Sequence, residues 1–151
     1  ISELHLKKIY VVELFRNLQH LMQPTFEQKK FELEIILKEP ELPLEADVNL
    51  VEQVLINLLV NAMDAVKDSA HPKIILSAYT GPKGKTMIKV ADNGAGMSQE
   101  VLDKIFIPFF STKKTGSGIG LSLCKQIMML HKGNIQAQSI EGEGSAFILQ
   151  F

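Results

Sequence analysis

Apolar residues recur along the chain at two kinds of spacing, which predict helices in some segments and strands in others. Between residues 11 and 26 the intervals are three and four, as expected for one face of a helix. The residues that follow this spacing are Leu14, Leu18, Leu21 and Met22. We therefore expect a helix from Val11 to Phe26.

A longer helix is expected from about Val48 to Lys67, because this segment is rich in apolar residues and contains neither glycine nor proline. Asp47 precedes it as the expected N-cap, since its carboxylate can accept a hydrogen bond from the first backbone N–H groups. A third helix is predicted from Gly118 to His131, where Lys132-Gly133 ends it. Ser98 is expected to cap a short helix that runs to Ile105.

Segments of alternating or continuous apolar character predict strands where turn residues bound them. They are residues 31–37, 73–79, 86–91, 135–139 and 146–151, with a shorter candidate at residues 7–10. Pro40 and Pro43 close the first of them, and we expect an irregular stretch there. Turns at Gly81–Gly84 and Gly142–Gly144 connect two hairpins, and residues 106–118 are expected to form a loop.

Together these elements predict an α/β (α+β) fold. A mixed, mostly antiparallel five-stranded sheet packs on about three helices in a two-layer sandwich. The chain of 151 residues has the size of one domain, and its 46% hydrophobic and 22% charged residues are ordinary values for a folded protein. We expect residues 1–151 to form that one domain, with residues 1–10 as a linker or a first strand.

The charge balance and the cysteine count exclude several classes of function. Sixteen Lys and Arg against seventeen Asp and Glu give a net charge of -1, so no nucleic-acid partner is expected. No window approaches the ~20 apolar residues of a membrane span, and we expect no membrane contact by this segment. Cys124 cannot form an internal disulfide, which favours the cytoplasm. Because the chain begins with Ile1 and not with Met, we expect it to be a piece of a longer protein.

The long predicted helix is apolar almost all round, except for one polar stripe. Its members follow one another at intervals of four, four, three and four: Gln53, Asn57, Asn61, Asp64 and Asp68. Such a stripe can simply face water. Two asparagines four residues apart in an apolar helix are less ordinary, because asparagine is a poor helix former and its carbonyl oxygen suits a hard cation.

Two glycine-rich segments stand where a nucleotide could bind. The first, Asp92-Asn93-Gly94-Ala95-Gly96, follows directly on a predicted strand. It forms either a tight turn or a surface for a flat purine. In the second case the carboxylate would accept a hydrogen bond from the exocyclic amine of the purine. The second, Gly116-Ser117-Gly118-Ile119-Gly120-Leu121, precedes a helix, and N–H groups at a helix N-terminus favour phosphate. Just upstream are hydroxyl and ammonium groups that could reach phosphate oxygens, in Ser111-Thr112-Lys113-Lys114.

The order of these motifs resembles that of the Bergerat-fold ATP-binding domain, and specifically of the catalytic domain of sensor histidine kinases. The matching segments, in chain order, are residues 53–65 (N box), 92–96 (G1), 107–113 (F), 116–121 (G2) and 142–145 (G3). The sequence GSGIGL is nearly a signature of the G2 box. The resemblance extends from about Val11 to Phe151.

This resemblance implies a protein-histidine kinase that uses ATP and Mg²⁺. It implies that Asn61 binds Mg²⁺ and that Asn57 and Lys113 take part in catalysis. Asp92 would bind the exocyclic amine of adenine. The residues that it implies for nucleotide binding are Asn57, Asn61, Asp92, Gly94, Gly96, Lys113, Gly116, Ser117, Gly118, Ile119, Gly120, Leu121 and Ser145.

The chain departs from the family pattern in two places. Asp64 stands three residues after Asn61, where the family often has a basic residue. None of the histidines is followed by the acidic residue and downstream proline that mark the family's phosphoacceptor; they are His5, His20, His71 and His131. The resemblance therefore implies that the phosphoacceptor lies on a separate dimerisation domain before Ile1. It also implies a response regulator receiver domain as the downstream partner.

Two other functions stay open from the sequence. A clamp ATPase of the gyrase, chaperone or mismatch-repair type resembles the same fold, but it carries a Glu where this chain has Asn57, and an amide cannot act as a general base. Glu52 does not replace that Glu, because it would lie about 140° around the helix from the polar stripe. A nucleotide-binding module without catalysis would keep the same motifs and signal by binding alone.

Overall fold

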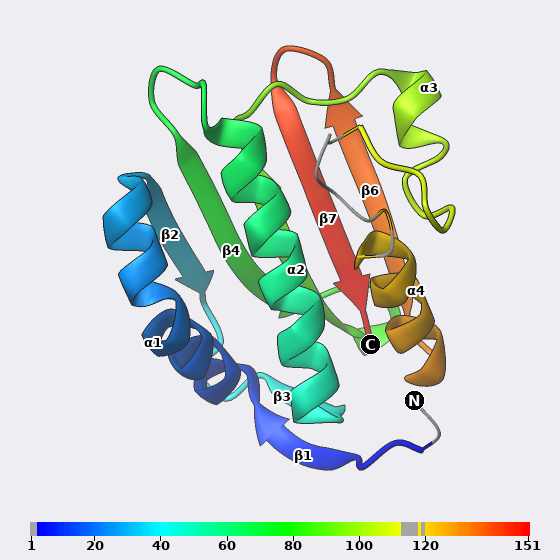
Figure 1. Ribbon diagram of the computed structural model, residues 1–151. Helices are drawn as coiled ribbons and strands as arrows, with labels where there is room; N and C mark the ends of the chain where they lie inside the picture. Colours follow the sequence, from blue (N-terminus) through cyan, green and yellow to red (C-terminus); the bar gives the residue numbers. More distant parts are fainter. Residues whose placement is uncertain (1–2, 113–117, 119) are drawn as a thin grey trace.

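The main sheet has five strands, whose spatial order differs from their order in the chain. The computed structural model describes residues 3–112, 118 and 120–151. Across the sheet lie β2 (Glu32–Leu37), β4 (Lys73–Thr80), β5 (Thr86–Asp92), β7 (Gly144–Gln150) and β6 (Asn134–Ile140) (Figure 1). β2 and β4 are parallel, and all other neighbours are antiparallel. The predicted mixed, mostly antiparallel sheet is confirmed.

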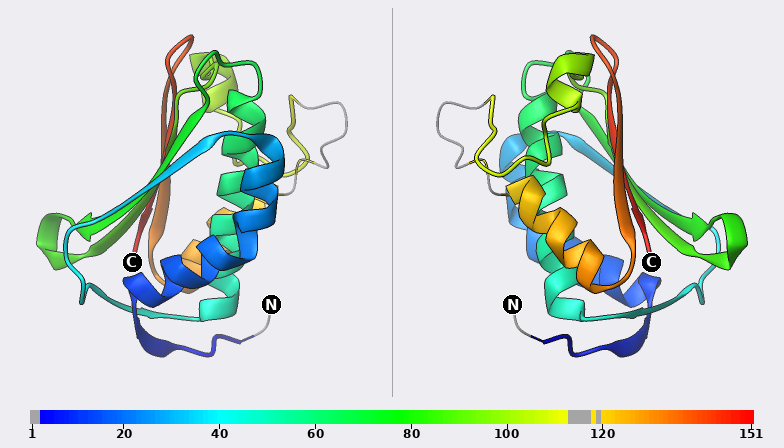
Figure 2. Two further views of the ribbon diagram at one scale, coloured as in Figure 1. Left: turned by 90° about the vertical axis from the view of Figure 1, so that its left-hand side faces the viewer. Right: turned by 90° about the vertical axis from the view of Figure 1, so that its right-hand side faces the viewer.

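Three long helices cover one face of this sheet (Figure 2). They are α1 (Val11–Lys29), α2 (Val48–Val66) and α4 (Gly120–Leu130). The predicted two-layer sandwich is therefore confirmed. A single helical turn, α3 (Gln99–Leu102), follows β5, and a 3-10 turn, η1 (Pro82–Gly84), connects β4 to β5.

A two-stranded sheet at the N-terminal end of α2 corrects one prediction. β1 (Lys7–Tyr10) pairs antiparallel with β3 (Pro43–Ala46), so the stretch expected to be irregular contains a strand. Pro43 is the first residue of β3, a position at which a strand tolerates proline because the missing N–H is not needed for pairing.

Two helices end at other residues than predicted. α1 continues past Pro24 to Lys29, because Met22 and Phe26, on either side of the proline, are both buried. This burial outweighs the backbone hydrogen bond that proline cannot make. The helix expected from Ser98 to Ile105 is shorter: Ser98 Oγ accepts from Val101 N–H at 3.3 Å as predicted, but helical geometry ends at Leu102.

The core lies between the helices and the sheet, and α2 runs through its centre. Eight residues of α2 are buried: Val51, Val54, Leu55, Leu58, Leu59, Ala62, Met63 and Val66. They pack against buried sheet residues such as Ile74, Ile88 and Leu149. Cys124 of α4 belongs to the same core, and burial raises the pKa of its thiol to about 12. Asn57, Asn61 and Asp64 of α2 do not belong to this buried set.

None of the helices among the described residues combines the length and the apolar character that a membrane crossing requires.

Candidate functional site

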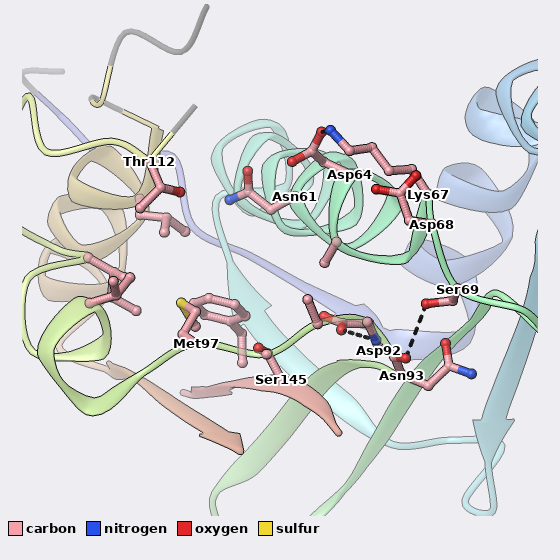
Figure 3. A pocket seen from close by; sticks show the side chains of 18 of the residues that line it. Asn61, Asp64, Lys67, Asp68, Ser69, Asp92, Asn93, Met97, Thr112 and Ser145 are labelled. Carbon is pink, nitrogen blue, oxygen red and sulfur yellow. Dashed lines mark hydrogen bonds and ion pairs between the residues drawn. The ribbon is translucent and has the colours of Figure 1, made fainter. Parts of the chain in front are cut away.

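A cleft of about 830 Å³ opens between α2, the loop after β5, the start of β7 and the start of α4 (Figure 3). This volume suits a small-molecule ligand. Every described residue that the sequence predicts for nucleotide binding lines it: Asn57, Asn61, Asp92, Gly94, Gly96, Gly118, Gly120, Leu121 and Ser145. Lys113, Gly116, Ser117 and Ile119 lie outside the described residues.

One wall of the cleft is the polar stripe of α2. Asn57, Asn61, Asp64 and Asp68 line the cleft, whereas Gln53, which the sequence pattern places on the same stripe, is exposed and does not. The start of α4 approaches this wall closely. A Cβ atom on Gly120 would lie 2.6 Å from Asn57 Nδ2, so the first residue of α4 lies directly against the Asn57 side chain. The N-terminus of α4 therefore stands beside the Asn57 amide.

Asp92 forms the opposite wall, at the end of β5. Its Oδ1 accepts a hydrogen bond of 2.9 Å from Gly94 N–H, which fixes the carboxylate. Burial raises the pKa of Asp92, although backbone N–H groups of Gly94 and Ser145 act in the other direction. A carboxylate that is held in place and partly desolvated is an effective acceptor for the amine of a flat heterocycle.

The glycines after Asp92 are required by close backbone approaches. A Cβ atom on Gly94 would overlap the carbonyl oxygen of Ala65, at the end of α2. Gly96 has a left-handed φ of 70°, and its Cβ would overlap the Ile140 carbonyl oxygen. The loop after β5 is thus pressed between α2 and β6. This packing explains why glycines stand two and four residues after Asp92.

Ser139 does not line the cleft but supports Ser145, which does, and the sequence analysis missed it. Its hydroxyl lies 2.8 Å from that of Ser145, accepts from Met97 N–H at 2.7 Å and lies 3.1 Å from the Gly144 carbonyl oxygen. These contacts hold the Ser145 hydroxyl in place at the edge of the cleft. The only signal in the sequence was its place opposite Ser145 across a hairpin.

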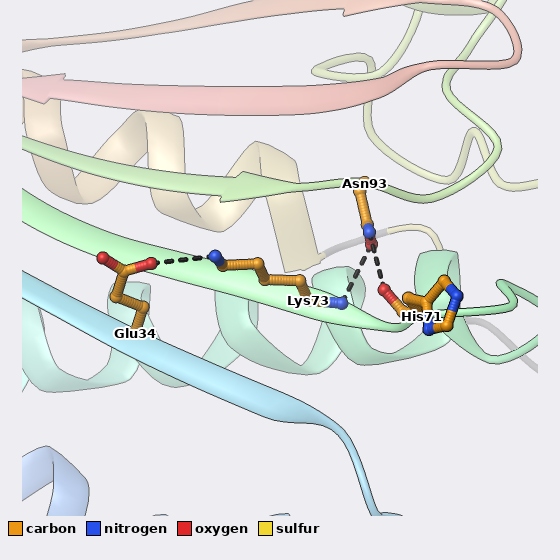
Figure 4. A network of polar contacts seen from close by, with 4 residues as sticks. All are labelled: Glu34, His71, Lys73 and Asn93. Atoms are coloured by element: carbon orange, nitrogen blue, oxygen red, sulfur yellow. Dashed lines mark hydrogen bonds and ion pairs between the residues drawn. The ribbon is translucent and has the colours of Figure 1, made fainter.

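Asn93 anchors the same loop from the outside (Figure 4). Its Oδ1 accepts from Lys73 N–H at 2.9 Å, and its Nδ2 donates to the His71 carbonyl at 2.7 Å. Lys73 in turn forms an ion pair of 3.0 Å with Glu34, which raises the pKa of its ammonium group. The amide of Asn93 therefore ties the glycine loop to the beginning of β4.

The donor set of the cleft limits how a metal could be held. Within residues 3–112, 118 and 120–151 no three His, Cys, Asp or Glu side chains gather as a metal cluster. Asn61 supplies one hard amide oxygen at the cleft wall. This suits Mg²⁺, which keeps several waters and takes further ligands from substrate phosphates.

Comparison with known proteins agrees with this geometry. Residues 46–151 match the family described as histidine kinase-, DNA gyrase B-, and HSP90-like ATPase. The signal transduction histidine-protein kinase AtoS of Escherichia coli K12 is 40% identical over 107 residues, which cover 71% of this chain and 17% of AtoS. The chain thus spans less than a fifth of that relative.

Solved structures with the same fold include histidine kinases. The catalytic domain of ThkA has a TM-score of 0.84 and 30% identity, covering 97% of this chain and 95% of that domain. ThkA in complex with the response regulator protein TrrA gives a TM-score of 0.84 at 28% identity, over 99% of this chain and 43% of ThkA. Full-length ShkA in complex with AMPPNP gives 0.86 at 25% identity, over 98% of this chain and 31% of ShkA.

Proposed function

Since the chain belongs to the family of histidine kinase-, DNA gyrase B-, and HSP90-like ATPases, we propose that it is the ATP-binding catalytic domain of a sensor histidine kinase. It transfers the γ-phosphoryl group of ATP to a histidine on a separate dimerisation domain. The observation that carries this proposal is the cleft, in which the asparagines of α2, Asp92 and the glycines before α4 meet around one cavity of nucleotide size. Residues 1–151 belong to one catalytic domain, of which β1 (Lys7–Tyr10) is the first strand.

Adenine is held at the Asp92 end of the cleft. The Asp92 carboxylate accepts a hydrogen bond from the exocyclic amine of adenine. The base lies on the loop at Gly94 and Gly96, where a side chain would overlap neighbouring backbone. Ser145 contributes a hydroxyl group on the same side. Guanine would present its O6 acceptor to the Asp92 carboxylate, so the site favours ATP over GTP.

The phosphates are held at the other end, between α2 and the start of α4. Asn61 holds Mg²⁺, which when bound neutralises phosphate charge and orients the γ-phosphoryl group. Asn57 positions the triphosphate, and backbone N–H groups at Gly118 and Gly120 bind its oxygens. The sequence also predicts nucleotide binding for Lys113, Gly116, Ser117 and Ile119, which lie outside the described residues. Catalysis is then mainly positioning and charge stabilisation, and the attacking histidine comes from another domain.

The clamp-ATPase alternative lacks its general base. Asn57, an amide, faces the start of α4 where that mechanism needs a carboxylate to activate water. Glu52 is on the same helix but does not line the cleft, so it does not supply the missing group. This difference favours phosphoryl transfer to a protein over hydrolysis.

Two partners follow from the proposal. The first is the dimerisation domain that carries the phosphoacceptor histidine. The second is a response regulator receiver domain, which is supported by the solved complex of ThkA with the response regulator protein TrrA. We propose the cytoplasm as the location of this reaction, because ATP is available there.

The experiment that tests this function measures phosphate transfer and hydrolysis together. The chain is incubated with γ-labelled ATP and Mg²⁺, alone and with the dimerisation domain of the full-length protein, and acid-labile protein phosphate and released phosphate are quantified. We expect label only when the dimerisation domain is present and little release at any time. Rapid phosphate release by the chain alone would favour a clamp ATPase. Label on His5, His20, His71 or His131 would show that the phosphoacceptor lies within this chain.

A further inference from the structure

Asn93 is the only asparagine of the chain that is followed by glycine. An asparagine in this position is prone to lose its side-chain amide, because glycine has no Cβ atom to obstruct the attack of its own backbone nitrogen on the asparagine side chain. Asn93 is also exposed, so water reaches it. Sequence and exposure thus mark Asn93 as a site of spontaneous covalent change.

The reaction needs no reagent besides water. The backbone nitrogen of Gly94 forms a bond to Asn93 Cγ while the bond from Cγ to Nδ2 breaks, and the departing ammonia takes up the Gly94 N–H proton. Water then adds to one of the two carbonyl carbons of the cyclic imide, whose C–N bond breaks. The product is aspartate or isoaspartate, according to which of the two bonds opens.

The fold holds both reacting groups in other contacts. The Asn93 amide lies between the Lys73 N–H and the His71 carbonyl oxygen, at 2.9 and 2.7 Å (Figure 4). The attacking N–H, that of Gly94, donates instead to Asp92 Oδ1 at 2.9 Å. Because these hydrogen bonds must break before the nitrogen can approach Cγ, the reaction requires a local opening of the loop after β5.

Aspartate at position 93 does not replace the amide. Its carboxylate can still accept from Lys73 N–H, but it has no N–H to donate to the His71 carbonyl oxygen and meets this oxygen with a negative charge. It also adds a second negative charge next to Asp92 in the chain. One anchor of the loop is therefore lost at the end of the cleft that carries Asp92.

Isoaspartate adds one atom to the backbone of a loop that is fixed at both ends. Before position 93, Asp92 pairs with Ser145 of β7 in the sheet. After it, Ala95 N–H donates to the Ala65 carbonyl oxygen at 3.3 Å, and a Cβ atom on Gly94 would overlap the same oxygen. An additional backbone atom cannot be accommodated between these contacts without displacing one of them.

We propose that Asn93 is a modification site, at which loss of the side-chain amide as ammonia impairs nucleotide binding, and that a bound nucleotide slows this loss. The second effect follows because a ligand that binds Asp92 favours the closed loop and so lowers the fraction of open molecules. The inference rests on the proposed function, since it takes Asp92 as the residue that holds the base.

Ageing of the wild-type chain tests the reaction itself. The chain is kept in mildly alkaline buffer with Mg²⁺, with and without an ATP analogue that cannot be hydrolysed, and peptide mapping by mass spectrometry measures conversion at each asparagine. A synthetic peptide of residues 88–99 gives the rate in an unfolded chain. We expect Asn93 to convert faster than every other asparagine, at least about tenfold more slowly than in the peptide, and more slowly again with the analogue.

The consequence for binding is measured by competition for a fluorescent ATP analogue. Asn93→Asp reproduces one product, and Asn17→Asp makes the same chemical change at an exposed position of α1 that does not line the cleft. We expect Asn93→Asp to bind ATP at least about tenfold more weakly than the wild type, and Asn17→Asp to bind it equally well. Aged wild-type chain should lose binding in proportion to the fraction converted at Asn93, which tests the inference even where Asn93→Asp does not fold.

The outcomes separate the inference from the function on which it rests. Conversion at Asn93 that is no faster than at the other asparagines, a rate that the analogue does not change, or aged chain that binds ATP as well as fresh chain overturns the role of Asn93 while leaving ATP binding intact. Fresh wild-type chain that binds no ATP overturns the proposed function before any ageing.

Discussion

The backbone N–H of Asp47 donates a hydrogen bond of 3.0 Å to Nε2 of His131, which lies 84 residues further along the chain. Nδ1 of the same ring is 2.8 Å from the Ile127 carbonyl oxygen. Because Nε2 accepts, the neutral ring carries its proton on Nδ1 and donates it to that carbonyl. His131 thus joins the N-terminus of α2 to the last turn of α4, the two helices that flank the cleft.

Replacing His131 by alanine should destabilise the fold. The N–H of Asp47, a buried residue, would lose its acceptor, and we expect the free energy of unfolding to fall by about 1–3 kcal/mol. Urea unfolding followed by circular dichroism measures this. His20→Ala is the control, because His20 is exposed on α1 and should change stability by less than about 0.5 kcal/mol. Equal losses in the two variants would contradict a specific role for His131.

The carboxylate of Asp47 should make stability depend on acidic pH. Its pKa is lowered from 3.8, chiefly by the hydrogen bond from His5 N–H at 3.1 Å and further by that from Leu50 N–H at 3.3 Å. Since the folded pKa lies below the unfolded one, the ionised group stabilises the fold above pH 3.8, and this contribution disappears as the pH falls through the folded pKa. Asp47→Asn keeps a capping oxygen but no charge. We expect the stability difference between wild type and Asp47→Asn to be full at neutral pH and to shrink in acid; a difference that is constant with pH would refute this.

Much of the candidate site could be predicted from the order of its motifs along the chain. Each motif alone had an ordinary explanation, a water-facing stripe for Asn57 and Asn61 and a tight turn for the glycines at 94 and 96, whereas their succession indicated a nucleotide site. The position of Asp47 as an N-cap also followed from the chain alone, and Leu50 N–H confirms it.

Other features depended on partners distant in the sequence. β3 was missed because Pro43 signals an end, whereas pairing with Tyr10 makes it the start of a strand. The contact between Asp47 and His131 has no local signal, since it exists only once α2 and α4 have packed. The parallel pairing of β2 with β4 likewise depends on the crossover through β3 and α2 that separates the two strands in the chain.

Gly96 and Gly84 provide a matched pair of substitutions. Their φ angles are nearly equal, 70° and 72°, but a Cβ on Gly96 would overlap the Ile140 carbonyl oxygen, whereas nothing lies within 4 Å of one on Gly84. Gly84→Ala should therefore cost only the left-handed strain, about 1–2 kcal/mol. Gly96→Ala should cost clearly more and should weaken ATP binding. Urea unfolding measures both costs, and equal costs would show that backbone conformation, and not the close approach to β6, requires glycine at position 96.

Asn61 should contribute to ATP binding only when Mg²⁺ is present. In Asn61→Ala the amide oxygen proposed to hold Mg²⁺ is lost, so we expect ATP affinity in Mg²⁺ to fall at least about tenfold, with little change in EDTA. Gln53→Ala is the matched control, since Gln53 follows the same sequence stripe but does not line the cleft. Calorimetry in the two buffers separates the effects. Unchanged affinity and unchanged magnesium dependence in Asn61→Ala would show that the metal is held elsewhere.

Asp92→Asn should separate stability from nucleotide recognition. The asparagine carbonyl can still accept from Gly94 N–H, so the loop keeps its hydrogen bond of 2.9 Å. Burial raises the pKa of Asp92, which means that the ionised carboxylate lowers the stability of the folded state at neutral pH. The neutral variant should therefore unfold at the same urea concentration as the wild type or at a higher one.

ATP binding by the same variant should move in the opposite direction. Loss of a charged acceptor for the adenine amine should weaken ATP by about 10–100-fold. The preference for ATP over GTP should also fall, because an amide can turn its NH₂ group toward the guanine O6. Competition between the two nucleotides for a fluorescent analogue measures this preference. If Asp92→Asn kept the wild-type preference, Asp92 would not be the residue that distinguishes adenine from guanine. A variant that is at least as stable as the wild type but binds ATP more weakly would show that the partly buried charge of Asp92 serves ligand binding and not stability.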